Sequence, residues 1–353
     1  MSMSQTCVLV LHNEPVLPAD HPDVESEREI LETVAIVSRV LSEEGFRVRT
    51  LGVANELSTL LEGLRSLRPE VVFNLFEGLA DRPFTESVVA GILEWLEIPF
   101  TGSSSDTLSL ARDKQRAKHL FHGAGLPTPP FLTIDGLPFP KCELSWPVMV
   151  KPAAQDASVG IEQGSVVTDQ AALEKRINLV LKRYGGPVLV EQYIAGREFH
   201  FHVVETAPGD LQVLPPAEVV FNDPELWPIF SYDAKWAPES REYRSTPLVT
   251  PVMLPPRQMA QLAELVRSAF RLLNCRDYAR VDLRVTNADV PFILEVNPNP
   301  FINSIALSNG LEAIGRRHPD FLADLVKSAL GRRSPAAGGR KSRSRAPRLQ
   351  KNS

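Results

Sequence analysis

Two neighbouring segments near the carboxyl end of the chain have the alternating pattern of a β-hairpin. They are YARVDLRV at residues 278–285 and FILEVNPNP at residues 292–300. Alternation of apolar and polar residues with a period of two predicts strands, and the Asn-Ala-Asp break between them contains turn-favouring residues. We therefore predict an antiparallel hairpin whose turn is centred between Ala288 and Asp289.

The predicted register brings four polar side chains onto one face of the hairpin. It places Asp282 opposite Glu295 and Arg280 opposite Asn297, and side chains two residues apart share a face of a strand. The other face is apolar and is expected to be buried; it consists of Val281, Leu283, Val285, Phe292, Leu294 and Val296.

Two carboxylates directly opposite each other repel, by about 3 kcal/mol at about 5 Å and an effective dielectric constant of about 20. A cation is therefore expected beside Asp282 and Glu295. Arg280 could be that cation, which would make the hairpin an arginine–carboxylate cluster on a solvated sheet. The oxygen atoms of Asp282, Glu295 and Asn297 are also the ligands that Mg²⁺ prefers, commonly together with phosphate oxygens. The hairpin alone leaves both interpretations open.

Other segments favour the metal interpretation, because a metal completed by phosphate also needs cations and backbone amides. Lys114, Lys151 and Lys235 offer the cations, and the small-residue loop at 156–160 offers the amides. A single lysine is more typical of a surface charge. Lys151 differs because it ends the apolar run Pro-Val-Met-Val and precedes Pro152.

Residues 6–104 alternate strand and helix patterns, which predicts a parallel, doubly wound α/β domain with crossover helices. Helices are expected over about 56–67 and 87–96, and an earlier helix is expected to end at Gly45. The buried face of that earlier helix is predicted to contain Ile30, Val34, Val37 and Leu41.

The carboxyl ends of the predicted parallel strands are candidate ligand sites. Asn13 and Glu14 follow the first predicted strand, and Glu77 follows the buried run EVVFNLF. Ligands of open α/β sheets bind beyond these strand ends, so by analogy the three residues are expected near a site.

The remaining residues predict two further α+β lobes. One helix is expected from about 106 to 122, and the proline-rich stretch 127–130 is expected to lie at a lobe boundary. A central lobe then covers 105–196 and includes a helix over about 170–184. The third lobe, 197–330, contains an amphipathic helix over about 259–273, the hairpin and a final helix.

Composition narrows the class of protein. No run approaches the roughly 20 apolar residues that a membrane span needs, and the opening residues lack a basic segment followed by an apolar core, so a cytosolic protein is expected. Cys7, Cys142 and Cys275 are far apart and are expected to be buried free thiols. Residues 331–353 hold eight Lys or Arg and no acid, which leaves −13 of charge on residues 1–330. This basic tail is expected to be disordered, without a specific nucleic-acid site.

Motifs along almost the whole chain resemble the ATP-grasp superfamily, and within it the D-alanine:D-alanine ligases. The resemblance covers roughly residues 6–330 in order. It is carried by IPFTGS, LARDKQRAK, VMVKP, SVGI, VLVEQYIAGREF, AKW, YARVDL and LEVNPNP. The resemblance implies an α/β ATP-grasp fold, in which the N-terminal doubly wound domain is followed by two lobes that clasp ATP.

The resemblance also implies a role for individual residues in binding the nucleotide. The implied contacts are Lys114 and Lys151 to the phosphates, Ser158 in the phosphate loop, Glu191 and the backbone near Ile194 to adenine, and Glu198 to the ribose hydroxyls. None of these roles follows from spacing alone.

Further implied roles concern the chemistry. Lys235 would reach the γ-phosphate, and Asp282, Glu295 and Asn297 would bind two Mg²⁺ ions, with Mn²⁺ as an alternative. Arg280 would stabilise the oxyanion that forms when an amine attacks an acyl phosphate. The family is often dimeric, which makes a homodimer a further expectation.

The chain departs from the family where the amino-acid substrates bind. In the family, the first serine of the phosphate-loop motif Ser-Ser-Val-Gly forms a hydrogen-bonded set with a glutamate and a tyrosine. In this chain Ala157 stands in place of that serine, and Trp236 stands in place of the tyrosine. An indole nitrogen cannot accept a hydrogen bond. The glutamate could be Glu27, although the Ser-Glu-Arg-Glu run around it is also an ordinary acidic helix start, which we favour.

Three more positions differ from the family pattern, again where the amino-acid substrates of the family bind. Glu77 and Gly78 stand where the family has His-Gly, residues 300–303 read Pro-Phe-Ile-Asn instead of Pro-Gly-Met-Thr, and Ala306 replaces a later serine. The sequence therefore favours an ATP-dependent carboxylate–amine ligase with amino-acid-type, small-molecule substrates other than D-alanine. The alternatives are a D-alanine:D-alanine ligase, and a regulator that binds ATP without catalysis.

Overall fold

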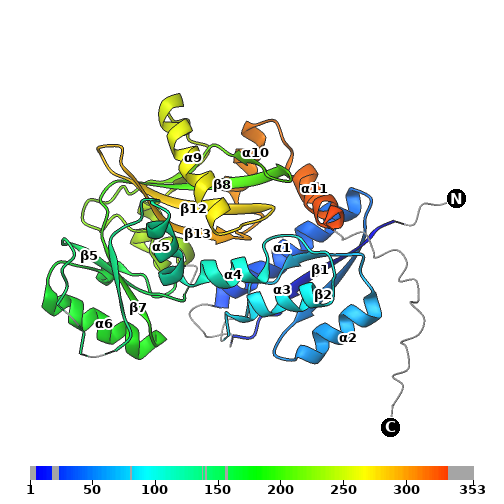
Figure 1. Cartoon of the computed structure of the whole chain (residues 1–353), viewed down its shortest axis with the longest axis horizontal. Coiled ribbons are helices and arrows are strands. Elements are labelled where there is room, and N and C mark those ends of the chain that lie inside the picture. Colours follow the sequence, from blue (N-terminus) through cyan, green and yellow to red (C-terminus); the bar gives the residue numbers. More distant parts are fainter. Residues whose placement is uncertain are drawn as a thin grey trace, which may run out of the picture.

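The computed structural model describes residues 5–17, 24–79, 82–136, 138–139, 141–155 and 158–332, and within the first helix it describes side chains from residue 29 onward. Most of the predicted basic tail lies outside these residues. Three sheets make up the described part, and Figure 1 shows them in different regions of the molecule.

The first sheet is parallel, in the order β2-β1-β3, as the alternation of strands and helices predicts. Its elements are β1 (Cys7–Asn13), α1 (Val24–Glu43), β2 (Arg47–Val53), α2 (Leu57–Leu67), β3 (Val71–Leu75) and α3 (Thr85–Trp95). The predicted buried positions of α1 all lie in the core, which confirms its amphipathic pattern. All three cysteines are buried and free, as predicted.

The second sheet is antiparallel, in the order β4-β7-β5-β6, and α6 packs against it. This part of the chain contains α4 (Ser105–Arg112), α5 (Lys114–Gly123), β4 (Phe131–Ile134), β5 (Val148–Pro152), a 3-10 turn (Gln163–Ser165), β6 (Val166–Val167), α6 (Gln170–Tyr184) and β7 (Val188–Gln192). Its apolar core is its own and includes Val148, Val150, Ile177 and Val190.

The third sheet has the order β11-β10-β8-β12-β13, with β9 paired to β8. Its elements and helices are β8 (Arg197–Ala207), β9 (Asp210–Val213), β10 (Ala217–Val219), α7 (Tyr232–Trp236), α8 (Arg241–Ser245), β11 (Leu248–Val249), α9 (Pro256–Leu272), β12 (Tyr278–Val285), β13 (Pro291–Pro298), α10 (Ile305–Ala313) and α11 (His318–Gly331). Helix α9 covers the apolar face, so that the polar face of β8, β12 and β13 is left for a site.

One core joins the first and last parts of the chain. Phe321 and Val326 of α11 belong to the same buried cluster as Val10 and Phe73 of the first sheet. Helix α11 also packs against α1, as Figure 1 shows. Helix α11 thus completes the core of the first sheet. The division of the chain into three sequential lobes stays a prediction.

The single helix predicted over 106–122 is wrong, because two helices occupy this stretch. Asp113 has non-helical backbone angles and its carboxylate accepts a hydrogen bond from the Arg116 N–H at 3.0 Å, so it caps the second helix. The break turns Lys114 toward the phosphate loop. Its backbone N–H donates to the Ala153 carbonyl at 3.3 Å, and its Nζ donates to the Gln155 carbonyl at 2.6 Å.

Replacing Asp113 by alanine is expected to lower the free energy of unfolding by about 1 kcal/mol, because it removes this helix cap. Asp113→Asn is the matched control, since an asparagine oxygen can still accept the Arg116 N–H. Urea denaturation of both variants measures the difference. Equal stabilities of the two variants would show that the cap does not hold the break.

The predicted hairpin register is confirmed for its polar residues: Asp282 pairs with Glu295, and Arg280 pairs with Asn297. Toward the turn the register shifts by one, because a β-bulge follows Asp282. The predicted buried face is therefore wrong at Leu294 and at Phe292, which is only half-buried and pairs with Arg284. Ile293 is fully buried in place of Leu294, while Leu294 lines a cavity next to Glu295.

Candidate active site

Three strands build one polar face, because β12 lies between β8 and β13. Along β12 the residues Arg280, Asp282 and Arg284 lie beside His202, His200 and Glu198 of β8, in that order. On the other side, Asn297 and Glu295 of β13 lie beside Arg280 and Asp282. Six of these residues are buried: Glu198, His200, His202, Asp282 and Arg284 almost completely, and Arg280 for the most part.

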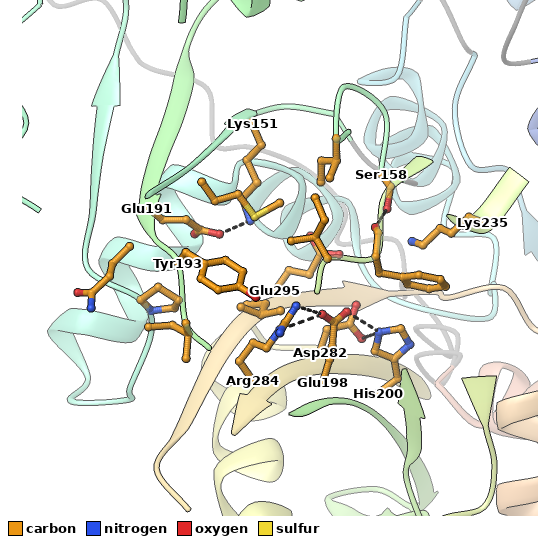
Figure 2. A pocket seen from close by; sticks show the side chains of 18 residues that line it. Lys151, Ser158, Glu191, Tyr193, Glu198, His200, Lys235, Asp282, Arg284 and Glu295 are labelled. Carbon is orange, nitrogen blue, oxygen red and sulfur yellow. Dashed lines mark hydrogen bonds and ion pairs between the residues drawn. The ribbon is translucent and has the colours of Figure 1, made fainter. Parts of the chain in front are cut away.

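A cavity lies between this face and the second sheet. Figure 2 shows Lys151 and Glu191 on one side and Asp282, Glu198 and His200 on the other. Eight of the residues predicted for the site line it: Lys151, Ser158, Glu191, Ile194, Glu198, Lys235, Asp282 and Glu295. Residues separated by more than 140 positions in the sequence thus meet here.

The other three predicted residues do not line the cavity, but each of them contacts a residue that does. Lys114 places Nζ 3.4 Å from a Glu295 carboxylate oxygen. Arg280 donates two hydrogen bonds to Asp282, at 2.7 and 2.9 Å, and the Asn297 amide donates to the same carboxylate at 3.1 Å. The fold therefore brings all eleven predicted residues into one region.

Glu191 is held by two lysines, one of which was not predicted. Its carboxylate lies 2.5 Å from Lys151 Nζ and 2.8 Å from Lys118 Nζ. Burial alone would raise the pKa of Glu191, but the two lysines lower it below its ordinary value. Lys118 is itself buried and also donates to Thr128. Its position one helical turn after Lys114 was the signal that could have identified it.

Glu198 forms a second buried pair, with Arg284. The Arg284 guanidinium donates to the Glu198 carboxylate at 3.0 Å, and His200 Nε2 lies 3.3 Å from the other oxygen. Burial would raise the pKa of Glu198, but Arg284, followed by His200, lowers it to about 2. Arg284 was not among the predicted residues, although the period-two face that contains Arg280 and Asp282 continues to it.

The low pKa of Glu198 predicts a stability change in acid. A carboxyl group whose pKa is lowered on folding stabilises the protein above its unfolded pKa, and this contribution is lost as pH falls through the folded pKa. The change from 4.5 to about 2 corresponds to roughly 3 kcal/mol. The wild type should therefore exceed Glu198→Gln in unfolding free energy by the largest amount near pH 7. This difference should decrease as the pH falls from about 4.5 to about 2. A pH-independent difference in urea denaturation would contradict this.

The carboxylates of Asp282 and Glu295 fit a divalent cation. In the part of the chain that the structure describes, no group of three or more His, Cys, Asp or Glu residues is arranged to hold a metal ion, so a site needs an amide. Asn297 supplies one: its Nδ2 lies 3.1 Å from Asp282 Oδ2 and 3.5 Å from Glu295 Oε1. A partially positive group thus lies between two carboxylates. Turning the amide over would present three oxygen ligands there.

Glu295 stays ionised beside these groups. Burial would raise its pKa, but Lys114 and then Lys151 and Lys235 hold the pKa of Glu295 well below its usual range. A carboxylate ionised over the whole physiological range suits cation binding.

Lys235 and Ser158 form the third side of the cavity, as Figure 2 shows. Among the described residues Lys235 has no ion-pair partner within 4.0 Å, and its Nζ lies 4.9 Å from the centre of the Phe230 ring. Burial and, after it, Arg280 lower the pKa of Lys235. Ser158 donates to the Phe230 carbonyl at 2.9 Å, which ties the phosphate loop to the segment before α7. With no counter-ion among the residues that the structure describes, this amino group is available to a phosphate.

The residues that depart from the family pattern lie in several places. Trp236 ends α7 next to Lys235, and Ala306 is buried in α10. Ala157 and the side chain of Glu27 lie outside the described residues. Glu77 lines a second, smaller cavity, and its backbone N–H donates to the Asn13 amide oxygen at 3.3 Å.

Comparison with known proteins decides the family. The sequence model of the D-ala D-ala ligase C-terminus matches residues 120–327. A D-alanine–D-alanine ligase from Moorella thermoacetica is 31% identical over 317 residues, which cover 86% of this chain and 96% of that enzyme. The chain belongs to the D-alanine–D-alanine ligase family.

Other members of the family include a D-alanine–D-alanine ligase of Rhizobium meliloti, 31% identical over 86% of this chain and 94% of that enzyme. An uncharacterized protein of Sinorhizobium fredii is 33% identical over 66% of each chain. The crystal structure of the Bacillus anthracis D-alanine–D-alanine ligase complexed with ATP is 19% identical, with a TM-score of 0.71 over 93% of this chain and 98% of that one. The predicted ATP-grasp fold is confirmed.

As a member of the D-alanine–D-alanine ligase family, the chain is an ATP-dependent ligase that forms carbon–nitrogen bonds. Ligases of this family use ATP and divalent metal ions. Among the described residues no helix is long and apolar enough to cross a membrane.

Proposed function

We propose that this ligase joins a carboxylate to an amine through an acyl phosphate, with at least one substrate other than D-alanine. The observation that carries the proposal is the arrangement of the cavity. Lys151 and Lys235 line it together with Asp282 and Glu295, and Arg280 donates two hydrogen bonds to Asp282. Phosphoryl transfer depends chiefly on positioning and on neutralising charge, and this arrangement supplies both.

ATP would occupy the cavity with its base near Glu191 and the backbone of Ile194. Glu191 keeps its negative charge between two lysines, so it can accept a hydrogen bond from the adenine amino group. Glu198, ionised beside Arg284, would accept hydrogen bonds from the ribose hydroxyls. Lys114 and Lys151, with the loop at Ser158, would then contact the phosphates.

Asp282, Glu295 and Asn297 would hold two Mg²⁺ ions, or Mn²⁺, because their oxygen atoms match the preference of these hard cations. A divalent metal bound there would neutralise charge on the phosphates as the phosphoryl group moves. Lys235 would contact the γ-phosphate from the opposite side of the cavity.

The proposed reaction has two steps. A carboxylate oxygen attacks the γ-phosphorus of ATP, which breaks the bond to ADP and forms an acyl phosphate. A neutral amine then attacks the acyl carbon, and the tetrahedral intermediate expels phosphate and loses a proton to give the amide. Arg280 stabilises the oxyanion of that intermediate. The products are the amide, ADP and phosphate.

The difference from D-alanine rests on the replaced side chains. Trp236 offers only an N–H donor in place of a hydroxyl, and Ala306 offers no hydrogen bond at all in place of a serine. A site built to hydrogen-bond a polar group of its substrate rejects an analogue without that group by about 10⁴-fold or more, so the polar side chains of a site select its substrate. These replacements therefore support another donor or acceptor.

A phosphate-release assay tests the proposal. The purified full chain is incubated with ATP and Mg²⁺ and with pairs drawn from D- and L-amino acids and small amines, and the products are identified by mass spectrometry. We expect release only with a specific pair, and little with D-alanine alone. Rapid D-alanyl-D-alanine formation would overturn the substrate part of the proposal. ATP binding without phosphate release for any pair would favour a non-catalytic regulator.

A further inference from the structure

Two lysines share one buried carboxylate beside the cavity that is proposed to hold ATP. Glu191 of β7 places its carboxylate 2.5 Å from the Nζ of Lys151 on β5 and 2.8 Å from the Nζ of Lys118 on α5. All three side chains are buried, and Lys118 is only 1% exposed. One carboxylate neutralises one ammonium group, so the cluster holds one positive charge more than Glu191 needs as its counter-ion.

The two lysines are held in different ways. Lys151 lines the cavity and points to Glu191 in Figure 2, and among the described residues Glu191 is its only ion-pair partner. Lys118 does not line the cavity, and its Nζ also donates to the Thr128 hydroxyl at 2.9 Å. Lys151 is therefore the lysine of this pair that a ligand in the cavity can reach.

A chain of hydrogen bonds fixes Lys118 to the third sheet. The Thr128 hydroxyl, which accepts from Lys118, donates to the Ile293 carbonyl of β13 at 2.9 Å. The neighbouring Pro127 carbonyl accepts the Ile293 N–H at 2.8 Å. The Lys118 ammonium thus has one partner on the second sheet and one in a segment that is held on the third. A ligand that fills the cavity does not displace it from Glu191.

The charges of the cluster favour this difference between the lysines. Burial lowers the pKa of Lys118, Glu191 raises it, and Lys151 lowers it again because the two ammonium groups repel. Movement of Lys151 away from Glu191 removes that repulsion and leaves Lys118 and Glu191 as a neutral pair. Without Lys118, the same movement would leave the Glu191 carboxylate buried with no cation, which is strongly unfavourable.

We propose that Lys118 is a positioning residue for the nucleotide: it remains the counter-ion of Glu191 and thereby frees Lys151 to bind the phosphates of ATP. Glu191 then stays ionised, while Lys118 itself touches no part of the nucleotide. The proposal rests on the contact between Lys151 and the phosphates that is proposed above, and it assigns a role to a residue outside the cavity.

Binding of inorganic tripolyphosphate with Mg²⁺ to the full chain, measured by calorimetry, tests the inference without turnover. Tripolyphosphate has no base, so it reports the phosphate contacts alone. Lys118→Met keeps the length of the side chain and removes its charge. We expect this variant to bind tripolyphosphate roughly 10- to 100-fold more weakly than the wild type, because Glu191 then retains Lys151.

The double variant Lys118→Met with Glu191→Gln separates this role from a merely structural one. A glutamine needs no counter-ion, so Lys151 is free again, and tripolyphosphate affinity should return to within about threefold of the wild type. Glu191→Gln alone should also bind tripolyphosphate at least as tightly as the wild type. If Lys118 served only to pack α5 against its neighbours, the second substitution would restore nothing.

A second substitution distinguishes the charge of Lys118 from its hydrogen bonds. Lys118→Gln can still donate to Glu191 but is neutral, so it should lose as much tripolyphosphate affinity as Lys118→Met does. Lys175→Met is the control, because Lys175 is an exposed residue of α6 that lines neither cavity. Urea denaturation of every variant shows that the loss occurs in a folded chain.

Two results would overturn the inference: unchanged tripolyphosphate binding in Lys118→Met, and an equal loss in Lys118→Met and in the double variant. Lys151→Met tests the proposed contact on which the inference rests. If it leaves the affinity unchanged, that contact is wrong and the inference falls with it. If Lys151→Met weakens binding and Lys118→Met does not, only the inference fails. The expected binding pattern without phosphate release from any substrate pair would remove the ligase reaction and leave the role of Lys118 standing.

Discussion

Asp282→Asn is expected to lower ATP-dependent phosphate release by about 10²- to 10³-fold. The change keeps the shape of the side chain and removes the negative charge that lies opposite Glu295 and beside Arg280. A neutral amide binds Mg²⁺ less well, so the Mg²⁺ concentration for half-maximal activity should also rise, by roughly 10- to 100-fold. A titration of phosphate release with Mg²⁺ measures both effects.

Asp289→Asn is the matched control for this variant. Asp289 lies in the turn of the same hairpin and accepts a hydrogen bond from Gln258 at 2.8 Å, away from both cavities. It should keep the activity of the wild type. Urea denaturation of Asp282→Asn is needed as well, because Arg280 loses its charged partner there. Wild-type activity and Mg²⁺ dependence in Asp282→Asn would contradict the metal assignment.

Arg280→Met should lower amide formation by about 10²- to 10³-fold, because the oxyanion of the tetrahedral intermediate loses its donor. The acyl phosphate should still form, so hydroxylamine, which traps acyl phosphates as hydroxamates, should give product at a rate much closer to that of the wild type. Arg280→Lys should recover only part of the loss, because an ammonium lacks the planar fork that binds Asp282 at 2.7 and 2.9 Å.

Arg271→Met is the control for Arg280→Met, since Arg271 is 56% exposed on α9 and lies in neither cavity. If hydroxamate formation in Arg280→Met falls as much as amide formation does, the arginine acts in phosphoryl transfer instead. Unchanged amide formation would remove it from the mechanism altogether.

Much of the third sheet's polar face could be predicted from local pattern alone. The period of two along the hairpin placed Arg280 opposite Asn297 and Asp282 opposite Glu295, as observed. The bulge after Asp282 could not be predicted in this way, because an extra residue in one strand depends on how both strands pack. It changes which side chain is buried, Ile293 in place of Leu294.

The structure differs from the sequence prediction at other places because one sequence pattern is consistent with more than one local structure. Tertiary contacts then determine which local structure forms. The continuous helical pattern across Asp113 gave no sign of a break, yet the break allows the Lys114 backbone to reach the Ala153 carbonyl. Lys118 is an ordinary helical lysine by pattern, and only the approach of Glu191, on a strand of the second sheet, makes it part of the site.

The sequence by itself determined the parallel first sheet and the polar register of the hairpin, because periodicity is a local property that a chain carries without folding. The ATP-grasp fold was implied by the resemblance of its motifs to a known family. Only the tertiary structure decided which charges pair and which remain free. Glu191 and Glu198 gain cations from distant segments, while Glu77 forms no ion pair with any described residue. Burial changes the energy of a charge only through its neighbours in space, so no spacing along the chain could reveal the second cavity.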